Sequence, residues 1–475
     1  MSLAIAVIGL LLPSLAVTLV LRMTAGSPVN LWCLIGVGGL AGLFFGAASV
    51  FVWASLGLPL ARRSLLLAWI FIAIVGVVTL AYRERYALPA EDESRQPECM
   101  RVSAQSEGIW YRLGVALLLL VILAHAIPIV TEVIVRPLYP YDATSAWATK
   151  AKVWSETGEF VRFVDKETWL NSDDPTLFTD HKPDYPIITP LLQLWTATLL
   201  GGWDVSLVNL PWILIYAYAL VLLFGLLREL RIGSLGSLLA TYVLASLPLF
   251  NTHIALAGYA DALRGVSVWA LLGVMVLWVR DREPWQLLIL ILFASACPLI
   301  KNEGAFWLLA SVSGLMVGLV TPRFALWCAG VGAGLAAGLL LVVPEHFVFA
   351  GHSLQQLDLG YREGTLHATF RSQIALGSFG VLYGCALGTI LLLTRMPRRN
   401  TCDDTVLLQL GLPLVLMHVL MYFLFSFTGY APGTIGLTAV SRINLALIPS
   451  LVLFLAVALN RLFDMTKHEV SPERP

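Results

Sequence analysis

The sequence predicts an all-α, polytopic membrane protein with roughly thirteen transmembrane helices and one large outer loop. Of its 475 residues, 58% are hydrophobic and only 13% are charged, whereas a soluble protein of this length carries about 25% charged residues. Apolar runs of about 17 residues or more recur from end to end, and each can cross a hydrocarbon core of about 30 Å as a helix. Between two of these runs lies a polar segment, residues 136–187, rich in Asp, Lys, Tyr and Trp.

The expected spans follow the hydropathy along the chain. They are residues 3–21, 31–57, 64–81, 113–135, 205–227, 235–254, 266–280, 286–300, 304–320, 324–343, 378–394, 405–427 and 443–460. Residues 186–202 are also apolar, but they are short and broken by two prolines and a Gly-Gly pair. We expect a half-helix there, and the sequence leaves open whether it crosses the membrane.

Basic residues in short loops predict the orientation, because such loops stay in the cytoplasm. In the second half of the chain these residues are Arg228, Arg231, Arg280, Arg282, Arg323, Arg395, Arg398, Arg399, Arg461 and Lys467. Placing them inside puts five segments together on the periplasmic face of an inner membrane: 136–187, 255–265, 301–303, 344–377 and 428–442. Arg62 and Arg63 then fall outside, so the orientation of the first three spans stays open.

Composition also limits the partners and cofactors. The formal net charge is zero, which gives no reason to expect a nucleic-acid partner. Six scattered cysteines without a CxxC pair predict neither a disulfide framework nor a zinc site. Three histidines in loop 344–377 match no known metal-ligand spacing. We expect no metal and no essential cofactor, and the oligomeric state stays open.

Asp142 begins the outer loop in the sequence YPYDATSAW. A carboxylate at the membrane surface could take the proton from an attacking hydroxyl. The alternative is a helix N-cap, and both roles are compatible. In the helix expected at 143–157, Trp147 and Trp154 share one face, which predicts an interfacial helix with its indoles at headgroup depth. Lys150 and Lys152 are expected to lie away from that face.

The end of the loop is the second polar patch, and it contains Lys182, Asp184 and Tyr185. Each of its two prolines holds the preceding residue extended, and a cation held rigidly there would suit a phosphate. The alternative is a polar turn ahead of a helix.

The third and fourth patches lie between apolar runs. Asp261 and Arg264 in GYADALRG could bind a ligand or simply pair with each other. Lys301 and Glu303 in KNEG have almost no loop around them, so the alternative is a snorkelling turn. Charge at membrane depth costs about 2.5–3.5 kcal/mol, which favours a function for these residues.

Two later segments complete the candidates. Loop 344–377 contains Arg362 and Arg371, for which a solvated loop is the default interpretation. Arg442 follows the last outer loop, with Tyr430 on its other side.

Taken together, these residues resemble the GT-C superfamily of polyprenyl-phosphate-sugar-dependent glycosyltransferases. The nearer likeness is to the bacterial branch with the aminoarabinose transferases of lipid A and the protein O-mannosyltransferases. Asp142 and helix 143–157 are similar to that family's acidic residue and surface helices after a span. Lys182-Pro183-Asp184-Tyr185-Pro186 is similar to its Lys-Pro-Pro-type re-entry, with Asp-Tyr inserted.

The remaining matches are Asp261, which resembles the family's second outer Asp, and the KNEG turn at 301–304, which resembles its Lys-x-Glu turn. The likeness covers about residues 113–310. It divides the chain into an N-terminal part (1–112), a catalytic part (113–310) and a C-terminal part (311–475). Here the acidic loop follows the fourth expected span instead of the first, and the paired acids of metal-dependent members are absent.

The resemblance implies transfer of a sugar from a polyprenyl-phosphate donor to an acceptor hydroxyl on a glycan, lipid or protein, with inversion and with Asp142 as general base. Negative charge grows on the departing phosphate and must meet fixed cations. The candidates are Lys182, Arg264, Lys301, Arg362, Arg371 and Arg442. Neither the sugar nor the acceptor can be predicted.

Three alternatives stay open. An O-antigen ligase or polymerase would use loop 344–377. Broken helices and charges at mid-membrane would favour a transporter or flippase for a lipid-linked glycan, whereas the charges here gather on one face. A scaffold subunit would leave the outer acids and lysines without a role.

Overall fold

The computed structural model describes residues 2–86, 108–320, 358–376, 379–395 and 402–470, with short pieces between 323 and 353. The predicted span 324–343 and the start of loop 344–377 lie largely outside the described residues. The described chain is almost entirely helical, and its strands form two two-residue pairs: parallel β1 (Phe163–Val164) with β2 (Phe178–Thr179), and antiparallel β3 (Val348–Phe349) with β4 (His352–Ser353).

Among the described residues, eight helices are long and apolar enough to cross a membrane. They are α1 (Ser2–Thr24), α2 (Leu31–Ser55), α3 (Arg62–Tyr86), α4 (Ile109–Val135), α8 (Leu210–Glu229), α11 (Ala260–Asp281), α18 (Cys402–Phe427) and α20 (Ala439–Val470). Helices α9 (Ser234–Ala245) and α10 (Pro248–Ala255) form an apolar pair bent by 59°, which has the form of a broken span or a re-entrant loop. The chain is therefore a multi-pass, all-α membrane protein.

Four of the expected apolar segments form helices of 10–17 residues: α7 (Ile188–Leu200), α12 (Pro284–Ile300), α13 (Gly304–Leu319) and α17 (Gly380–Arg395). A perpendicular span needs about 20 helical residues. The count of thirteen spans therefore stays a prediction. The short turn at residues 301–303 separates α12 from α13 and so limits the length of both helices. Helix α7 has 13 residues, a length that fits the half-helix that the sequence predicts.

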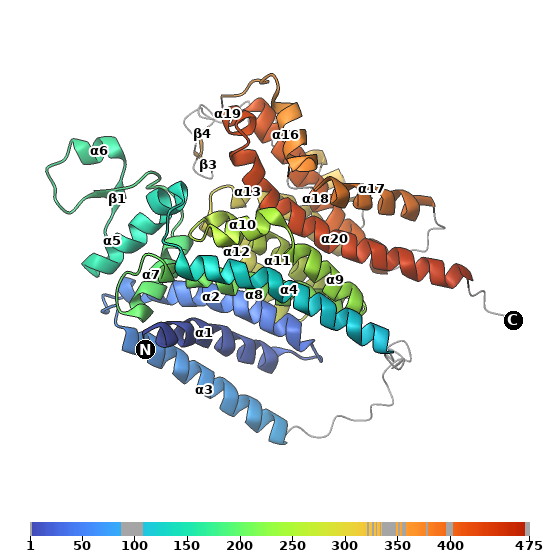
Figure 1. Ribbon diagram of the computed structural model, residues 1–475, viewed down its shortest axis with the longest axis horizontal. Coiled ribbons are helices and arrows are strands. Elements are labelled where there is room, and N and C mark those ends of the chain that lie inside the picture. The colour runs from blue at the N-terminus through green and yellow to red at the C-terminus, as the bar shows by residue number, and fades with distance from the viewer. Residues whose placement is uncertain are drawn as a thin grey trace.

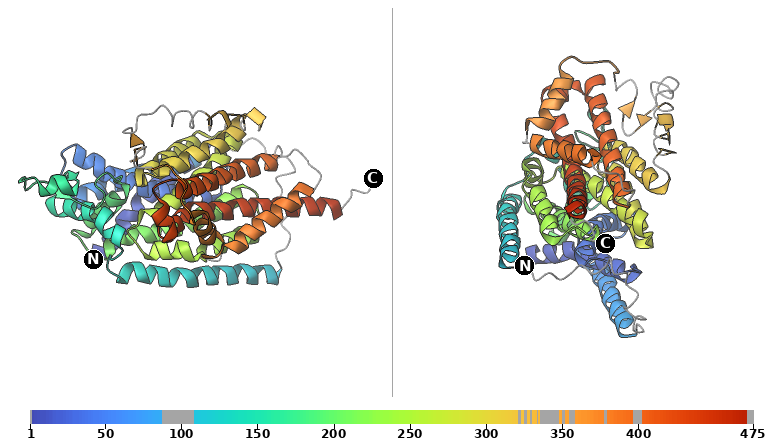
Figure 2. Two further views of the ribbon diagram at one scale, coloured as in Figure 1. Left: turned by 90° about the horizontal axis from the view of Figure 1, so that it is seen from above. Right: turned by 90° about the vertical axis from the view of Figure 1, so that its right-hand side faces the viewer.

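The long helices run in roughly one direction, with the 136–187 segment at one end and the C-terminus at the other (Figures 1 and 2). Helix α11 is at the centre, where it packs against α8, α12, α13, α18 and α20, and 89% of its apolar window is buried. Gly265 permits the contact with α20, because a Cβ there would lie 2.4 Å from the Leu445 carbonyl oxygen. Small residues bring membrane helices this close.

The 136–187 segment folds back on itself. It contains the π-helical turn η3 (Ala143–Ala148), helix α5 (Thr149–Thr157), β1, helix α6 (Lys166–Leu170) and β2. Trp147 and Trp154 are only 2% and 4% exposed, so their indoles pack inside the protein and do not insert among lipid headgroups, while their depth in the bilayer stays a prediction. Trp147 stacks on Tyr185, and Trp154 packs on Phe160. The returning chain covers these rings, so they anchor the loop to the protein.

The remaining short elements lie between the spans. They are η4 (Leu207–Asn209), α16 (Thr365–Ile374) and α19 (Ala431–Ile435). Helix α19 follows α18 and precedes α20, and it packs against α16, α18 and α20. It therefore closes the C-terminal bundle at the end where the polar segments gather.

Candidate functional site

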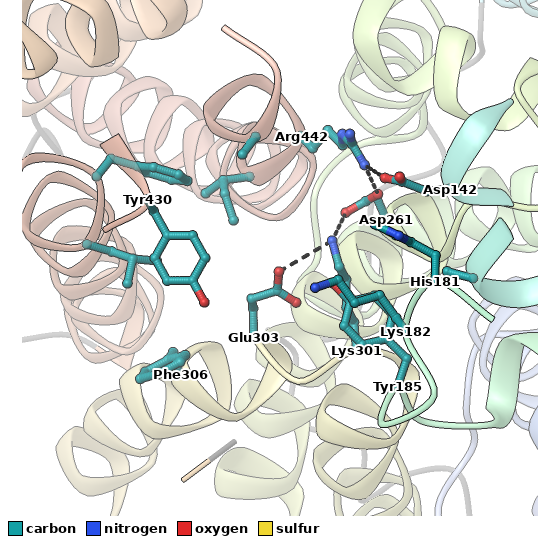
Figure 3. A pocket seen from close by; sticks show the side chains of 15 residues that line it. Asp142, His181, Lys182, Tyr185, Asp261, Lys301, Glu303, Phe306, Tyr430 and Arg442 are labelled. Carbon is teal, nitrogen blue, oxygen red and sulfur yellow. Dashed lines mark hydrogen bonds and ion pairs between the residues drawn. The ribbon is translucent and has the colours of Figure 1, made fainter. Parts of the chain in front are cut away.

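A cavity of about 290 Å³ lies where the polar segments meet the helix ends (Figure 3). Its lining comes from the 136–187 segment, from α11, from α13 and the turn before it, from α18, from the residue that precedes α19, and from α20. The lining residues are Asp142, Ala146, His181, Lys182, Tyr185, Asp261, Lys301, Glu303, Phe306, Leu424, Phe425, Tyr430, Ala439, Arg442 and Ile443. All four polar patches singled out in the sequence contribute to this one cavity.

Three helices begin at the cavity, and each brings one charged side chain. Asp261 is in the first turn of α11, Glu303 directly precedes α13, and Arg442 is in the first turn of α20. A helix N-terminus carries a partial positive charge from its free N–H groups. The cavity therefore lies in a region whose backbone favours anions.

Asp261 is the centre of the ion network and is 1% exposed. Its Oδ1 lies 3.1 Å from Lys301 Nζ and 3.3 Å from Arg264 Nη2, and its Oδ2 lies 3.8 Å from Arg442 Nη1. A carboxylate at this depth is tolerated only with such partners. The i, i+3 pairing of Asp261 with Arg264 forms as one of the predicted alternatives, within a larger network.

Lys301 and Glu303 face inward. Lys301 Nζ lies 3.4 Å from Glu303 Oε1, and Arg264 Nη1 lies 3.9 Å from Glu303 Oε2. A snorkelling turn would expose these side chains, but Lys301 is only 9% exposed. Arg264 is fully buried behind the cavity and does not line it. Its part is to support the two carboxylates.

Asp142 pairs with Arg442 across 300 residues of sequence. The Asp142 backbone is already helical, and its side chain makes no capping hydrogen bond. The N-cap interpretation is therefore wrong, because the carboxylate points to the Arg442 guanidinium instead. That guanidinium also lies over the Tyr259 ring at 5.2 Å. Arg442 thus joins Asp142 to Asp261, as the dashed lines in Figure 3 show.

Lys182 and Tyr185 bring the end of the loop into the cavity. Among the residues that the structure describes, no carboxylate pairs with the exposed Lys182 ammonium. Burial raises the pKa of the Tyr185 phenol, so its hydroxyl stays protonated and can donate. Asp184 is exposed and does not line the cavity.

The charges around the cavity balance except at Lys182. The carboxylates of Asp142, Asp261 and Glu303 are matched by Arg264, Lys301 and Arg442. Lys182, next to His181 on the same rim, has no ion-pair partner among the described residues, and the nearby Asp184 carboxylate is exposed outside the lining. A ligand with a negative group would meet an unpaired cation there.

The rest of the lining is apolar. Phe306 from α13, Leu424 and Phe425 from α18, and Ile443 from α20 form this wall. Tyr430 lies on the same side (Figure 3), and burial raises the pKa of its phenol. A cavity with one charged side and one apolar side suits an amphipathic ligand.

Arg362 and Arg371 lie elsewhere. Arg362 pairs with Asp358 in its own loop, and Arg371 is exposed on α16. No residue of the described part of loop 344–377 lines the cavity. Within the described ranges, no three His, Cys, Asp or Glu side chains lie close enough to share a metal ion.

Sequence reasoning missed a buried ion pair beside the cavity. Lys150 Nζ lies 2.5 Å from Asp180 Oδ2, and both side chains are buried. Lys150 was expected to lie away from the buried face, although it is three residues after Trp147 and four before Trp154. That spacing places it on the same helical stripe and could have indicated its burial. The residues of the apolar wall lie in apolar spans, and nothing in the sequence distinguishes them from the other residues of those spans.

In comparisons with protein-family models, with curated proteins and with solved structures, nothing matches this chain. Its function is therefore inferred from the chemistry of the cavity.

Proposed function

We propose that this protein is a membrane glycosyltransferase that moves a sugar from a polyprenyl-phosphate donor to an acceptor hydroxyl at the periplasmic face. The main support is the cavity itself, in which a Lys182 ammonium without an ion-pair partner among the described residues, a carboxylate at Asp142 and an apolar wall lie together. A lipid-linked phosphate needs a cation and an apolar surface, and an attacking hydroxyl needs a base.

In this proposal the donor phosphate lies near Lys182 and Lys301, and the isoprenoid chain follows the wall of Phe306 and Phe425. The acceptor hydroxyl lies beside Asp142, whose carboxylate takes the hydroxyl proton while the oxygen bonds to the anomeric carbon. The bond from that carbon to the phosphate oxygen breaks, and its electron pair leaves with the lipid phosphate. The configuration at the sugar is inverted.

Charge on the departing phosphate rises from one to two negative charges in this step. Lys182 and Lys301 are placed to stabilise it, since fixed cations lower the barrier where charge develops. Arg442 pairs with the Asp142 carboxylate and fixes its direction. Asp261 and Glu303 in turn hold Lys301 and Arg442, so they are positioning residues in this scheme.

The test uses Asp142→Asn. The purified protein is reconstituted in vesicles with pentosyl and hexosyl polyprenyl phosphates and with hydroxyl acceptors extracted from cell envelopes, and released polyprenyl phosphate is quantified. The wild type should release it, and Asp142→Asn should be slower by about 10²–10⁴-fold, as for loss of a general base. The amide keeps an oxygen acceptor for Arg442, so folding should persist.

Arg371→Met is the matched control, since Arg371 is exposed and lies outside the cavity. It should turn over like the wild type. Near-normal release by folded Asp142→Asn would remove Asp142 from the mechanism. Loss of activity in Arg371→Met with full activity in Asp142→Asn would instead favour the ligase-type enzyme that uses loop 344–377.

The bent helix pair α9–α10 supports a second candidate function, that of a transporter or flippase for a lipid-linked glycan. Transporters use bent or interrupted helices near their binding sites, and α10 packs against α11 and α20, which both line the cavity. Movement of the lipid-linked sugar across vesicles without release of polyprenyl phosphate would support this candidate over the transferase.

A further inference from the structure

The buried ion pair of Lys150 and Asp180 surrounds the backbone of Lys182. Lys150 Nζ donates to the Lys182 carbonyl oxygen at 2.7 Å, and the Lys182 N–H donates to Asp180 Oδ1 at 2.9 Å. The two charged groups contact each other at 2.5 Å, with side chains that are 3% and 0% exposed. Both polar groups of one residue's backbone are thus held by a single ion pair.

The same pair ties this backbone to the helix that follows Asp142. Lys150 Nζ also donates to the Ala146 carbonyl oxygen at 3.2 Å. One residue before Lys182, the His181 N–H donates to the Ser145 carbonyl oxygen at 3.0 Å. The segment that carries Lys182 is therefore fixed against the π-helical turn that follows Asp142, and the stacking of Trp147 on Tyr185 adds a third contact.

Burying an ion pair is a costly way to stabilise a fold, since an apolar pair of similar size is often as stable or more so. Charged groups whose hydrogen bonds hold the Lys182 backbone against the preceding helical turn are better explained by positioning. We infer that the Lys150–Asp180 pair is a positioning device that holds the Lys182 ammonium at the lipid-phosphate position. This inference rests on the function proposed above and assigns Lys150 and Asp180 a role through Lys182.

A double-mutant cycle tests this coupling. The full-length protein in lipid nanodiscs is titrated with farnesyl phosphate, and the Kd is measured for the wild type, Lys150→Met, Lys182→Met and the double variant. Loss of one charge-assisted hydrogen bond weakens binding about tenfold. Lys182→Met and Lys150→Met should each show this loss, and the double variant should bind no more weakly than Lys182→Met alone.

A merely structural role would not give this pattern. In that case Lys150→Met would lower the folded fraction without changing the Kd of the folded protein. Alternatively, its loss of affinity would add to the loss caused by Lys182→Met. Losses that multiply to about a hundredfold in the double variant would overturn the inference, as would a wild-type Kd in Lys150→Met. Lys152→Met is the matched control, since Lys152 is on the same helix with an exposed side chain, and it should bind normally.

Lys150→Met leaves Asp180 buried without its cation, and this variant can fail to fold. Lys150→Met/Asp180→Asn avoids that charge while keeping an oxygen for the Lys182 N–H. It should fold and show the same loss of about tenfold, and normal binding by it would overturn the inference. If Lys182→Met itself binds farnesyl phosphate normally, both the lipid-phosphate site and this inference fail. If Lys150→Met binds farnesyl phosphate with the wild-type Kd while Lys182→Met binds it more weakly, this inference is wrong but the lipid-phosphate site at Lys182 stands.

Discussion

At the scale of single residues, the cavity depends on charges that satisfy one another. Asp261 and Glu303 are held at depth by Lys301, Arg264 and Arg442. Removing one cation leaves the buried Asp261 carboxylate with fewer partners, and that loss can cost more than the net strength of the pair that was removed. The network therefore orients the functional groups, but substitution of any of its members is expected to destabilise the protein.

Lys301→Met should destabilise the protein by about 3–5 kcal/mol, because Asp261 loses its 3.1 Å partner while it stays buried. Thermal unfolding in detergent measures the loss, with Lys152→Met as the control at an exposed lysine. Double substitution with Asp261→Asn should recover part of the stability. An unfolding midpoint for Lys301→Met equal to that of the wild type would contradict the network described here.

Much of the candidate site could be predicted from residue types, but which charged side chains pair with each other could not. Lys182, Asp261, Lys301 and Arg442 were recognisable because charge is rare in so apolar a chain. The pairing of Asp142 with Arg442 joins residues 300 positions apart, and no local pattern encodes that distance. Burial of Lys150 depends on the loop folding over it, which is a tertiary effect. Arg362 and Arg371 were equally charged but lie outside the cavity.

At the scale of elements, the site depends on how closely α11 approaches its neighbours. Asp261 and Arg264 are in the first turns of α11, and Arg442 is in the first turn of α20. The contact at Gly265 therefore sets the distance between the two charged helix ends. Hydropathy predicted both spans but could not predict this contact.

Gly265→Val should separate α11 from α20, since even a Cβ would lie 2.4 Å from the Leu445 carbonyl oxygen. Overpacking of this kind costs about 1–3 kcal/mol or more, and the cavity should open between Asp261 and Arg442. Unfolding temperature and donor binding are both expected to fall. Gly384→Val in α17 is the control, because nothing lies within 4 Å of its Cβ position; equal losses in the two variants would reject the explanation.

The helix lengths explain why the span count was harder to predict than the spans. Hydropathy located the apolar runs, and eight of them are long helices in the described part of the chain. Run 235–254 is instead bent between α9 and α10, and run 324–343 lies largely outside the described residues. Helices α12 and α13 are shorter because the KNEG turn between them belongs to the site and interrupts the apolar stretch. A functional turn inside a hydrophobic region is where a count based on hydropathy is least secure.

At the scale of the whole molecule, the polar segments gather at one end of the helices and the C-terminus lies at the other (Figure 1). The proposed function requires that the first end faces the periplasm. The same orientation puts loop 136–187 and the exposed Glu363 outside, and the exposed Arg282 inside.

Cysteine labelling tests this orientation in whole cells. In a variant without the native cysteines, Glu159→Cys and Glu363→Cys should react with a membrane-impermeant maleimide. Arg282→Cys should react only after permeabilisation. Labelling of Glu159→Cys and Glu363→Cys from opposite sides would place the polar segments on different faces and end the proposed function.

Helix α4 gives the molecule a further property. Only 6% of its apolar window is buried, and its 27 residues are about 40 Å long at 1.5 Å per residue. Such a helix tilts to match the bilayer thickness, and Asp142 follows its last residue by seven positions. Acyl-chain length should thus tune turnover, and identical rates in thin and thick vesicles would show that the loop is insulated from the surrounding lipid.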